Sequence, residues 1–437
     1  MGWAYTWTLR GAQRRETPHL FAGKGFCCNG LSRTSPGDRA LVKTILLTGV
    51  ALLALAGPAA ALDMSSWEVA PYETTLGDDL QLKIRGAANG SLYAANQPNA
   101  PGLDQSGVTG AAWVGANLER DYDSGMTLAL KTVFEVYHDR LSGDNYGSDF
   151  VQKVYGAMQT GLGRVEIGNT DGVAYALAVT GPTVEGYTSI DNPNATFFRD
   201  PTTGRAFVNV FALNSANEAS LNYAKISYYS PRLFGVQIAA SFTPSEGKDV
   251  VPFLNNGPQA SDRQKNIWEA AASYTGYFGP VSLGFSGGWS SGHDDDKTVG
   301  HAGLTDWSLG TEIDYAINDD WKLAVGGAWR HSNAYAFNIY SVFATGETTS
   351  AHLSTTLTHG PWIVGGELGD GRADGRLGAS TIGLHAGSAT IGYVINSNLQ
   401  LNLGWEHFHY DRDTGAFYNG LPRIGMDAAF LHLQFQV

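Results

Sequence analysis

Hydrophobic and polar residues alternate with a period of two along most of this chain. The pattern is clearest at the end of the sequence, where apolar residues at every second position flank His432, Gln434 and Gln436. Successive side chains of a β-strand point to opposite faces of a sheet, so this pattern predicts a strand with one apolar face. The predicted strand extends to the last residue, Val437.

The same alternation recurs in earlier segments and gives sixteen predicted strands in all. They are residues 79–94, 108–120, 125–138, 148–160, 163–170, 219–231, 234–243, 266–278, 281–291, 304–317, 321–334, 347–359, 362–369, 380–395, 398–412 and 426–437. An even number of antiparallel strands brings both ends of the array to the same side.

The connections between these strands alternate between short and long. The short ones consist of turn-forming residues such as Gly161-Leu162, Pro231-Arg232, Gly279-Pro280, Asn318-Asp319-Asp320, Gly360-Pro361 and Asn396-Ser397. The others range from roughly ten to nearly fifty residues. A β-sandwich does not sort its loops in this way, whereas short turns on one side and long loops on the other are typical of outer-membrane barrels. We therefore expect an all-β protein, a transmembrane antiparallel β-barrel.

The two faces of the predicted strands differ in polarity. Leu399, Leu401, Leu403 and Trp405 share one face of a strand, and Gln400, Asn402 and Glu406 share the other. A Lys or Arg that faces lipid at mid-depth costs about 2–4 kcal/mol, so the polar face is expected to look inward onto water. Aromatic residues near the strand ends predict interfacial girdles; they are Phe278, Tyr315, Trp321 and Trp362.

The N-terminal region predicts export. Residues 42–61 combine Lys43, a short apolar run and the small residues Ala59, Ala60 and Ala61, which is the pattern of a signal peptide. Residues 1–41 contain six basic residues and no strand pattern, and we interpret them as a spurious extension from a misassigned start. An organelle-type transit segment is the alternative. The predicted mature barrel is residues 62–437.

Composition narrows the class further. Both cysteines, Cys27 and Cys28, lie in the doubtful extension, so no disulfide or Cys-based metal site is expected in the barrel. Residues 1–61 hold seven basic and two acidic residues, which leaves 21 basic and 39 acidic residues and a net charge of −18. Such acidity argues against nucleic-acid partners and favours cations, or polyanions bridged by divalent ions, as neighbours.

Two stretches carry a resemblance to a known family. QKVYGAMQTGLGRVEIGNT (152–170) has an aromatic-x-Gly strand, a Gly turn and a second strand that ends in Gly; YAKISYYSPRLFGVQIAASFTP (223–244) has Tyr-x-Ser-Pro at its turn. Together they resemble the general trimeric porins of Gram-negative bacteria. The resemblance implies a barrel of about sixteen strands whose third loop folds into the lumen, and it implies a homotrimer. The chain departs from the family in ending on Val437 and in lacking the Pro-Glu-Phe-Gly signature.

Residues 171–218, between the two motifs, are therefore the expected third loop, with an external surface loop as the alternative. The expected acidic constriction residues are Glu185, Asp191 and Asp200, and Tyr187, Phe197 and Phe198 are expected to pack the loop against the wall. Porins place basic residues opposite this loop, and the inward positions of the early strands offer Lys83, Arg85, Lys131, Arg164 and Lys225.

The resulting expectation is a passive diffusion channel for small hydrophilic solutes and ions, with mild cation preference. A channel specific for a sugar or phosphate, and a non-conducting barrel used as adhesin or scaffold, remain alternatives. No catalytic residue, cofactor or metal site is expected. His407 and His409 share a strand face but have no carboxylate partner in the sequence pattern, and Asp294-Asp295-Asp296 suits a solvated loop near lipopolysaccharide.

Overall fold

The computed structural model describes residues 70–77, 79–97, 105–138, 151–191, 197–198, 216–245, 264–294, 303–333, 345–375, 381–413 and 423–437. The predicted extension and signal peptide lie outside these residues and stay predictions. No helix in the described ranges is long and apolar enough to span a membrane.

The described chain consists of strands and one short helix. The elements are β1 (Tyr72–Leu76), β2 (Leu80–Asn96), β3 (Ser106–Asp121), β4 (Thr127–His138), β5 (Val151–Thr160), β6 (Gly163–Asn169), α2 (Val173–Ala176), β7 (Ala224–Tyr229), β8 (Val236–Ser245), β9 (Gln264–Phe278), β10 (Val281–Asp294), β11 (Thr305–Ala316), β12 (Trp321–Ser332), β13 (Thr345–His359), β14 (Trp362–Gly375), β15 (Ile382–Asn396), β16 (Leu399–Arg412) and β17 (Arg423–Gln436).

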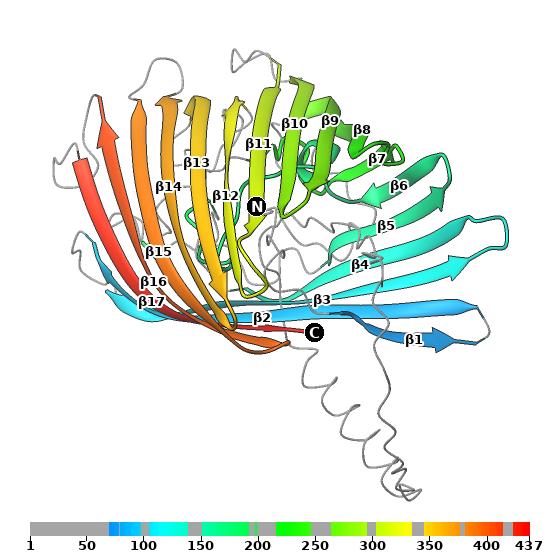
Figure 1. The fold of residues 1–437 in the computed structure, drawn as a ribbon. Coiled ribbons are helices and arrows are strands. Elements are labelled where there is room, and N and C mark those ends of the chain that lie inside the picture. Colours follow the sequence, from blue (N-terminus) through cyan, green and yellow to red (C-terminus); the bar gives the residue numbers. More distant parts are fainter. Residues whose placement is uncertain are drawn as a thin grey trace, which may run out of the picture.

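Strands β2 to β17 form a closed antiparallel ring of sixteen, as the alternation predicts (Figure 1). Each strand pairs with its neighbours in the chain, and the ring closes where β17 pairs with β2, with Leu431 opposite Leu92. The predicted short turns all fall at one end of the ring, which we name the turn end. The longer connections fall at the other end, the loop end.

The extra strand β1 was not predicted. It pairs with the first half of β2, from Tyr72 opposite Ile84 to Leu76 opposite Leu80. The second half of β2 pairs with β17, and the backbones of Val437 and Gly86 exchange hydrogen bonds of 2.8 and 2.9 Å. Strands β1 and β17 thus follow one another along one edge of β2. The stagger of the closed ring leaves the start of β2 beyond the end of β17, and β1 pairs with that exposed edge.

The two faces of the wall have the predicted polarity over most of their height. On β11, the outward residue Leu309 is 60 % exposed, whereas the inward residue Glu312 is 7 % exposed. The four predicted girdle residues are all exposed, and Trp362 packs against Tyr393 with ring centroids 4.7 Å apart. An apolar exterior and a polar interior follow from lipid outside and water inside.

One part of the wall reverses this polarity. Near the loop end of β15, β16 and β17, the inward residues form an apolar cluster that includes Leu384, Phe408 and Met426. The outward residues there are polar, among them His385 and His409. The sequence expectation that the polar face looks inward is therefore wrong for this region. The inner face is apolar because Phe197 and Phe198 of the segment after β6 cover it.

Candidate functional site

The segment after β6 comprises residues 170–223 and leads to β7. Two buried lysines hold its two ends, which together form its base. Lys225 on β7 donates hydrogen bonds to the carbonyl oxygens of Thr170 (2.6 Å), Ser220 (3.2 Å) and Leu221. Lys153 on β5 pairs with Asp171 at 2.7 Å. Burial raises the pKa of the Asp171 carboxyl, and the two lysine ammonium groups oppose that shift. These bonds hold both ends of the segment together beside β5 and β7.

The middle of the segment crosses the wall strand by strand. The helix α2 packs on β8, β9 and β10. The amide of Val179 donates to Ser286 Oγ on β10 (2.7 Å), and the carbonyl of Thr180 lies 3.1 Å from His352 Nδ1 on β13. Gln400 on β16 donates to the carbonyl of Val184 (3.1 Å). Each of these wall side chains is on the inner face, so the segment follows that face from β8 to β16.

Glu185 organises the turn at which the segment reaches β17. Its carboxylate accepts hydrogen bonds from the amides of Tyr187 (2.7 Å) and Thr188 (2.8 Å) and from the Thr188 hydroxyl. One carboxylate oxygen lies 3.4 Å from His432 Nε2, and the Tyr187 ring stacks on the His432 ring with centroids 5.2 Å apart. Glu185 therefore acts as a buried turn-forming group, because its oxygens are occupied by its own segment.

Phe197 and Phe198 anchor the part of the segment that is farthest along the chain from its base, as the sequence suggests. Phe197 stacks on Tyr93 of β2 (4.9 Å) and packs on Phe430 of β17 (5.4 Å). Phe198 meets Phe408 of β16 edge-on at 5.2 Å. Both are fully buried in the apolar cluster at the loop end.

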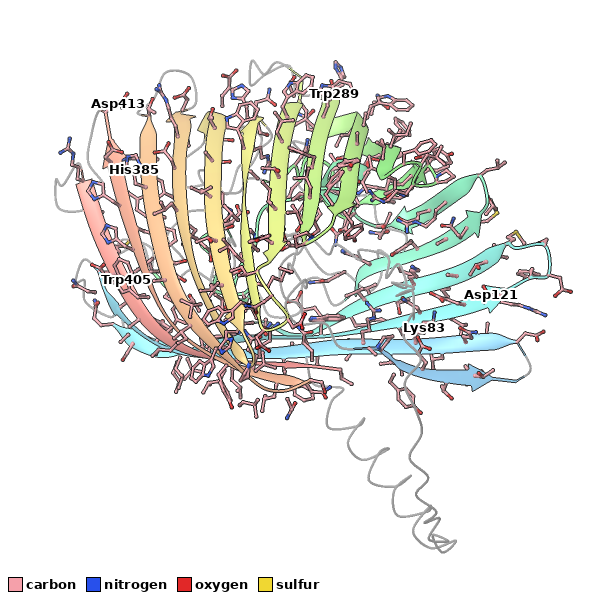
Figure 2. All side chains as sticks on the ribbon, in the orientation of Figure 1. Lys83, Asp121, Trp289, His385, Trp405 and Asp413 are labelled. Atoms are coloured by element: carbon pink, nitrogen blue, oxygen red, sulfur yellow. The ribbon has the colours of Figure 1, made fainter. Side chains whose placement is uncertain are left out.

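Basic side chains gather on the inner face of β2 to β6. Lys83 pairs with Glu119 at 2.6 Å, and Arg164 pairs with Glu166 at 3.0 Å while its guanidinium lies over the Tyr229 ring. Lys131 lies in the same cross-strand row as Lys83, with Asn117 between them. Figure 2 labels Lys83 on this part of the wall. Arg85, two residues from Lys83 on the same face of β2, is the fourth cation of this group, and the two ion-paired carboxylates are Glu119 and Glu166.

Two of these four cations have no direct counter-ion. Arg85 and Lys131 make no hydrogen bond or ion pair to another described residue. Lys131 interacts electrostatically with the cations Arg164 and Arg85 and with the carboxylates Glu166 and Glu119. The cluster therefore carries a local excess of positive charge in a strongly acidic chain.

Carboxylates occupy the inner face of the wall from β11 to β16. Glu312, Glu367 and Glu406 lie in one cross-strand row over β11 to β16, separated by small residues. Glu367 binds His352 at 3.1 Å and the Ser189 hydroxyl at 2.6 Å. One oxygen of Glu406 has no hydrogen-bond partner within the described ranges. The sequence analysis assigns the acidic constriction residues to the loop alone. The alternation on β16 nevertheless predicts that Glu406 faces inward.

The predicted constriction residues thus separate into groups. Lys83, Arg85, Lys131 and Arg164 gather on one wall, and Asp191 lies close enough to interact with His352 on the other. Lys225 and Glu185 are buried and engaged in holding the segment, so their side chains are not presented to the centre of the barrel. Asp200 lies outside the described residues.

The sequence model of the Gram-negative porins matches residues 48–413. The chain belongs to this family. No relative was found among curated protein sequences.

Solved structures support the fold. The anion-selective porin from Comamonas acidovorans is 13 % identical with a TM-score of 0.51, covering 82 % of this chain and 100 % of that one. In-vitro folded OmpT of Vibrio cholerae is 11 % identical with a TM-score of 0.50, covering 84 % and 100 %. At such identities the likeness concerns the fold alone.

Family membership and the closed ring establish an outer-membrane porin channel, embedded in the membrane by its sixteen strands. They indicate a channel and not an enzyme. In such barrels the short turns face the periplasm and the long loops face outward, so the loop end of this porin is the extracellular end.

Proposed function

We propose that this porin is a passive diffusion channel for small hydrophilic solutes and ions, narrowed where the segment after β6 lies along the inner wall. The observation that carries the proposal is the path of that segment. Its contacts run from Lys153 on β5 to His432 on β17, all to inward side chains. A segment fastened at so many points on the inner face reduces the open cross-section of the barrel.

The charges beside the passage set its selectivity. Arg85 on β2 and Lys131 on β4 supply positive charge on one side, and Glu312 on β11 and Glu367 on β14 lie across the ring. Opposite charges across a hydrated passage let a dipolar solute align, whereas an apolar solute must displace ordered water. Pore radius and the charged rings then decide which solutes pass. The proposed channel catalyses no reaction.

The overall charge favours cations. With a net charge of −18 after residue 61, the potential around the barrel concentrates cations at its mouths. The basic wall opposes this effect locally, so the expected preference is mild.

The channel is expected to work as a homotrimer surrounded by outer-membrane lipids and lipopolysaccharide, because that is the assembly implied by its family resemblance. Light scattering of the detergent-solubilised protein measures this directly. A protein mass equal to one chain would contradict the trimer without affecting the channel.

Reconstitution into planar lipid bilayers tests the channel. We expect discrete conductance steps in KCl and a reversal potential of cation-selective sign in a salt gradient. An anion-selective reversal potential would contradict the cation preference. Saturable block by one sugar or by phosphate would favour a solute-specific channel, and the absence of steps would favour a blocked barrel that acts as adhesin or scaffold.

A further inference from the structure

The outer face of β16 changes character above Trp405. The outward positions below it are Leu401 and Leu403, and those above it are His407 and His409. Tryptophan side chains mark the boundary between hydrocarbon and headgroups, so the two histidines lie beyond the hydrocarbon. Figure 2 labels Trp405, and higher on the wall His385 and Asp413 toward the loop end. The polar patch is therefore accessible to ions at the extracellular end.

Strand register brings a third histidine to this patch. His385 on β15 pairs directly with His409 on β16, and His407 is two residues away on the same face. On β17, Gly425 is opposite His409, and a β-carbon there would lie 3.8 Å from His409 Nδ1 and 3.9 Å from His407 Cε1. Because residue 425 is glycine, the space between these two rings stays open on the outer surface.

Two carboxylates orient two of the three rings. Asp370 Oδ2 lies 2.6 Å from His385 Nδ1, and Asp427 Oδ1 lies 2.9 Å from His407 Nδ1. A carboxylate beside Nδ1 favours the tautomer that carries the proton there, which leaves a lone pair on Nε2. Metal-binding histidines in proteins are held in the same way, by a carboxylate on the nitrogen that does not bind the metal.

We propose that His385, His407 and His409 bind a divalent transition-metal ion such as Zn²⁺ on the outer surface of the barrel. Imidazole nitrogen is a preferred Zn²⁺ ligand, and three protein nitrogens leave a further position for water or an external ligand. Ca²⁺ and Mg²⁺ prefer oxygen ligands. Asp370 and Asp427 place two carboxylates beside the histidines, and these attract a cation and repel a phosphate group.

Binding requires the rings to turn toward a common point. Within the described ranges, no three His, Cys, Asp or Glu side chains already surround a metal-sized space. The rings have room to move, because His385 is 62 % exposed and His407 is 40 % exposed. Their contacts with Asp370 and Asp427 involve Nδ1 only, so those contacts can be retained while Nε2 binds the ion.

Equilibrium dialysis against Zn²⁺ tests the proposal on the untagged full chain in detergent. We expect one saturable Zn²⁺ per chain. His409→Gln should abolish that binding, and Asp427→Asn should weaken it about 10–100-fold, the range for loss of such an orienting carboxylate. The control is His331→Gln, because His331 is also outward and stacks on Trp329 as His407 does on Trp405. This control should bind Zn²⁺ as the unmodified chain does.

Each other outcome overturns the site. The proposal is wrong if the unmodified chain shows no saturable Zn²⁺ binding, or if the His409→Gln variant binds Zn²⁺ equally well. It is also wrong if the unmodified chain binds inorganic phosphate and the His409→Gln variant does not. All variants change outward side chains, so circular dichroism should stay that of the unmodified barrel. Their single-channel conductance should also stay unchanged, so failure of the metal site and failure of the channel proposal are separate results.

Discussion

The carbonyl oxygen of Val179 occupies the place that a β-carbon on Gly310 would take. Gly310 is on the inner face of β11, and the backbone of the segment after β6 lies directly against it. Other inward glycines continue this close approach, with Gly326 beside Gly181 and Gly365 beside Val184. The segment can follow the wall because several strands carry no side chain where its backbone crosses them.

Gly310→Ala is therefore expected to push the segment away from β11 toward the centre of the barrel. The added carbon should lower single-channel conductance and destabilise the fold by about 1–3 kcal/mol, the usual cost of overpacking. Gly90→Ala is the matched control, because a β-carbon on this β2 glycine meets no atom within 4 Å. Equal conductance in the Gly310→Ala variant and the unmodified channel would contradict a segment held tightly against β11.

Lys225→Met should loosen the base of the same segment. The substitution leaves the carbonyls of Thr170, Ser220 and Leu221 without their shared donor. Breaking a buried charged network costs about 3–5 kcal/mol, so unfolding in urea should begin at a markedly lower concentration. Open-channel current should become noisier. Lys322→Met serves as control, because Lys322 pairs with Asp314 in a partly exposed position; a similar loss in both variants would indicate a general effect of lysine removal.

Strand positions and faces were predictable because lipid outside and water inside impose a local rule on every second residue. The prediction stopped β14 at residue 369, but the strand continues to Gly375. There Asp370 and Arg372 face outward above the hydrocarbon, so the apolar signal ends before the strand does. Strand β1 was missed because five residues give too short a pattern, and its pairing depends on the stagger at ring closure.

The contacts that define the site were not predictable, because they depend on register between distant residues. The sequence places His407 and His409 on one face, but the carboxylate partner Asp427 comes from the next strand. Likewise, alternation predicts that Lys225 faces inward, but not that three backbone carbonyls surround its ammonium group. Inward orientation follows from local pattern, whereas exposure to the passage depends on the path of the segment.

Replacing Arg85 and Lys131 together by Gln should make the channel more cation-selective. Both are inward cations without a direct counter-ion, so their charge acts on passing ions. A unit charge 4 Å from an ion in water is worth about 1 kcal/mol, so the K⁺ to Cl⁻ permeability ratio should rise a few-fold. Reversal potentials in a KCl gradient measure this ratio. Arg120→Gln is the control, because Arg120 pairs with Asp79 in an exposed position near the turn end; an equal shift there would locate the selectivity outside the basic wall.

Replacing Phe197 and Phe198 together by Ala should release the far end of the segment while leaving the barrel closed. Each ring is fully buried against inward aromatic residues, and Phe→Ala in a packed core costs about 3–5 kcal/mol. The barrel strands pair with one another independently of these rings, so circular dichroism should keep its strand signal. Mean conductance should fall and the open-channel current should become noisier, because a released segment leaves the wall and fluctuates within the passage. Phe242→Ala, which removes an outward ring packed on Trp268, should leave conductance unchanged. If the double variant instead conducts as the unmodified channel does, the segment is held in place by its base, by Glu185 and by its hydrogen bonds to β10, β13 and β16. The apolar cluster then stabilises the loop end of the wall without positioning the constriction.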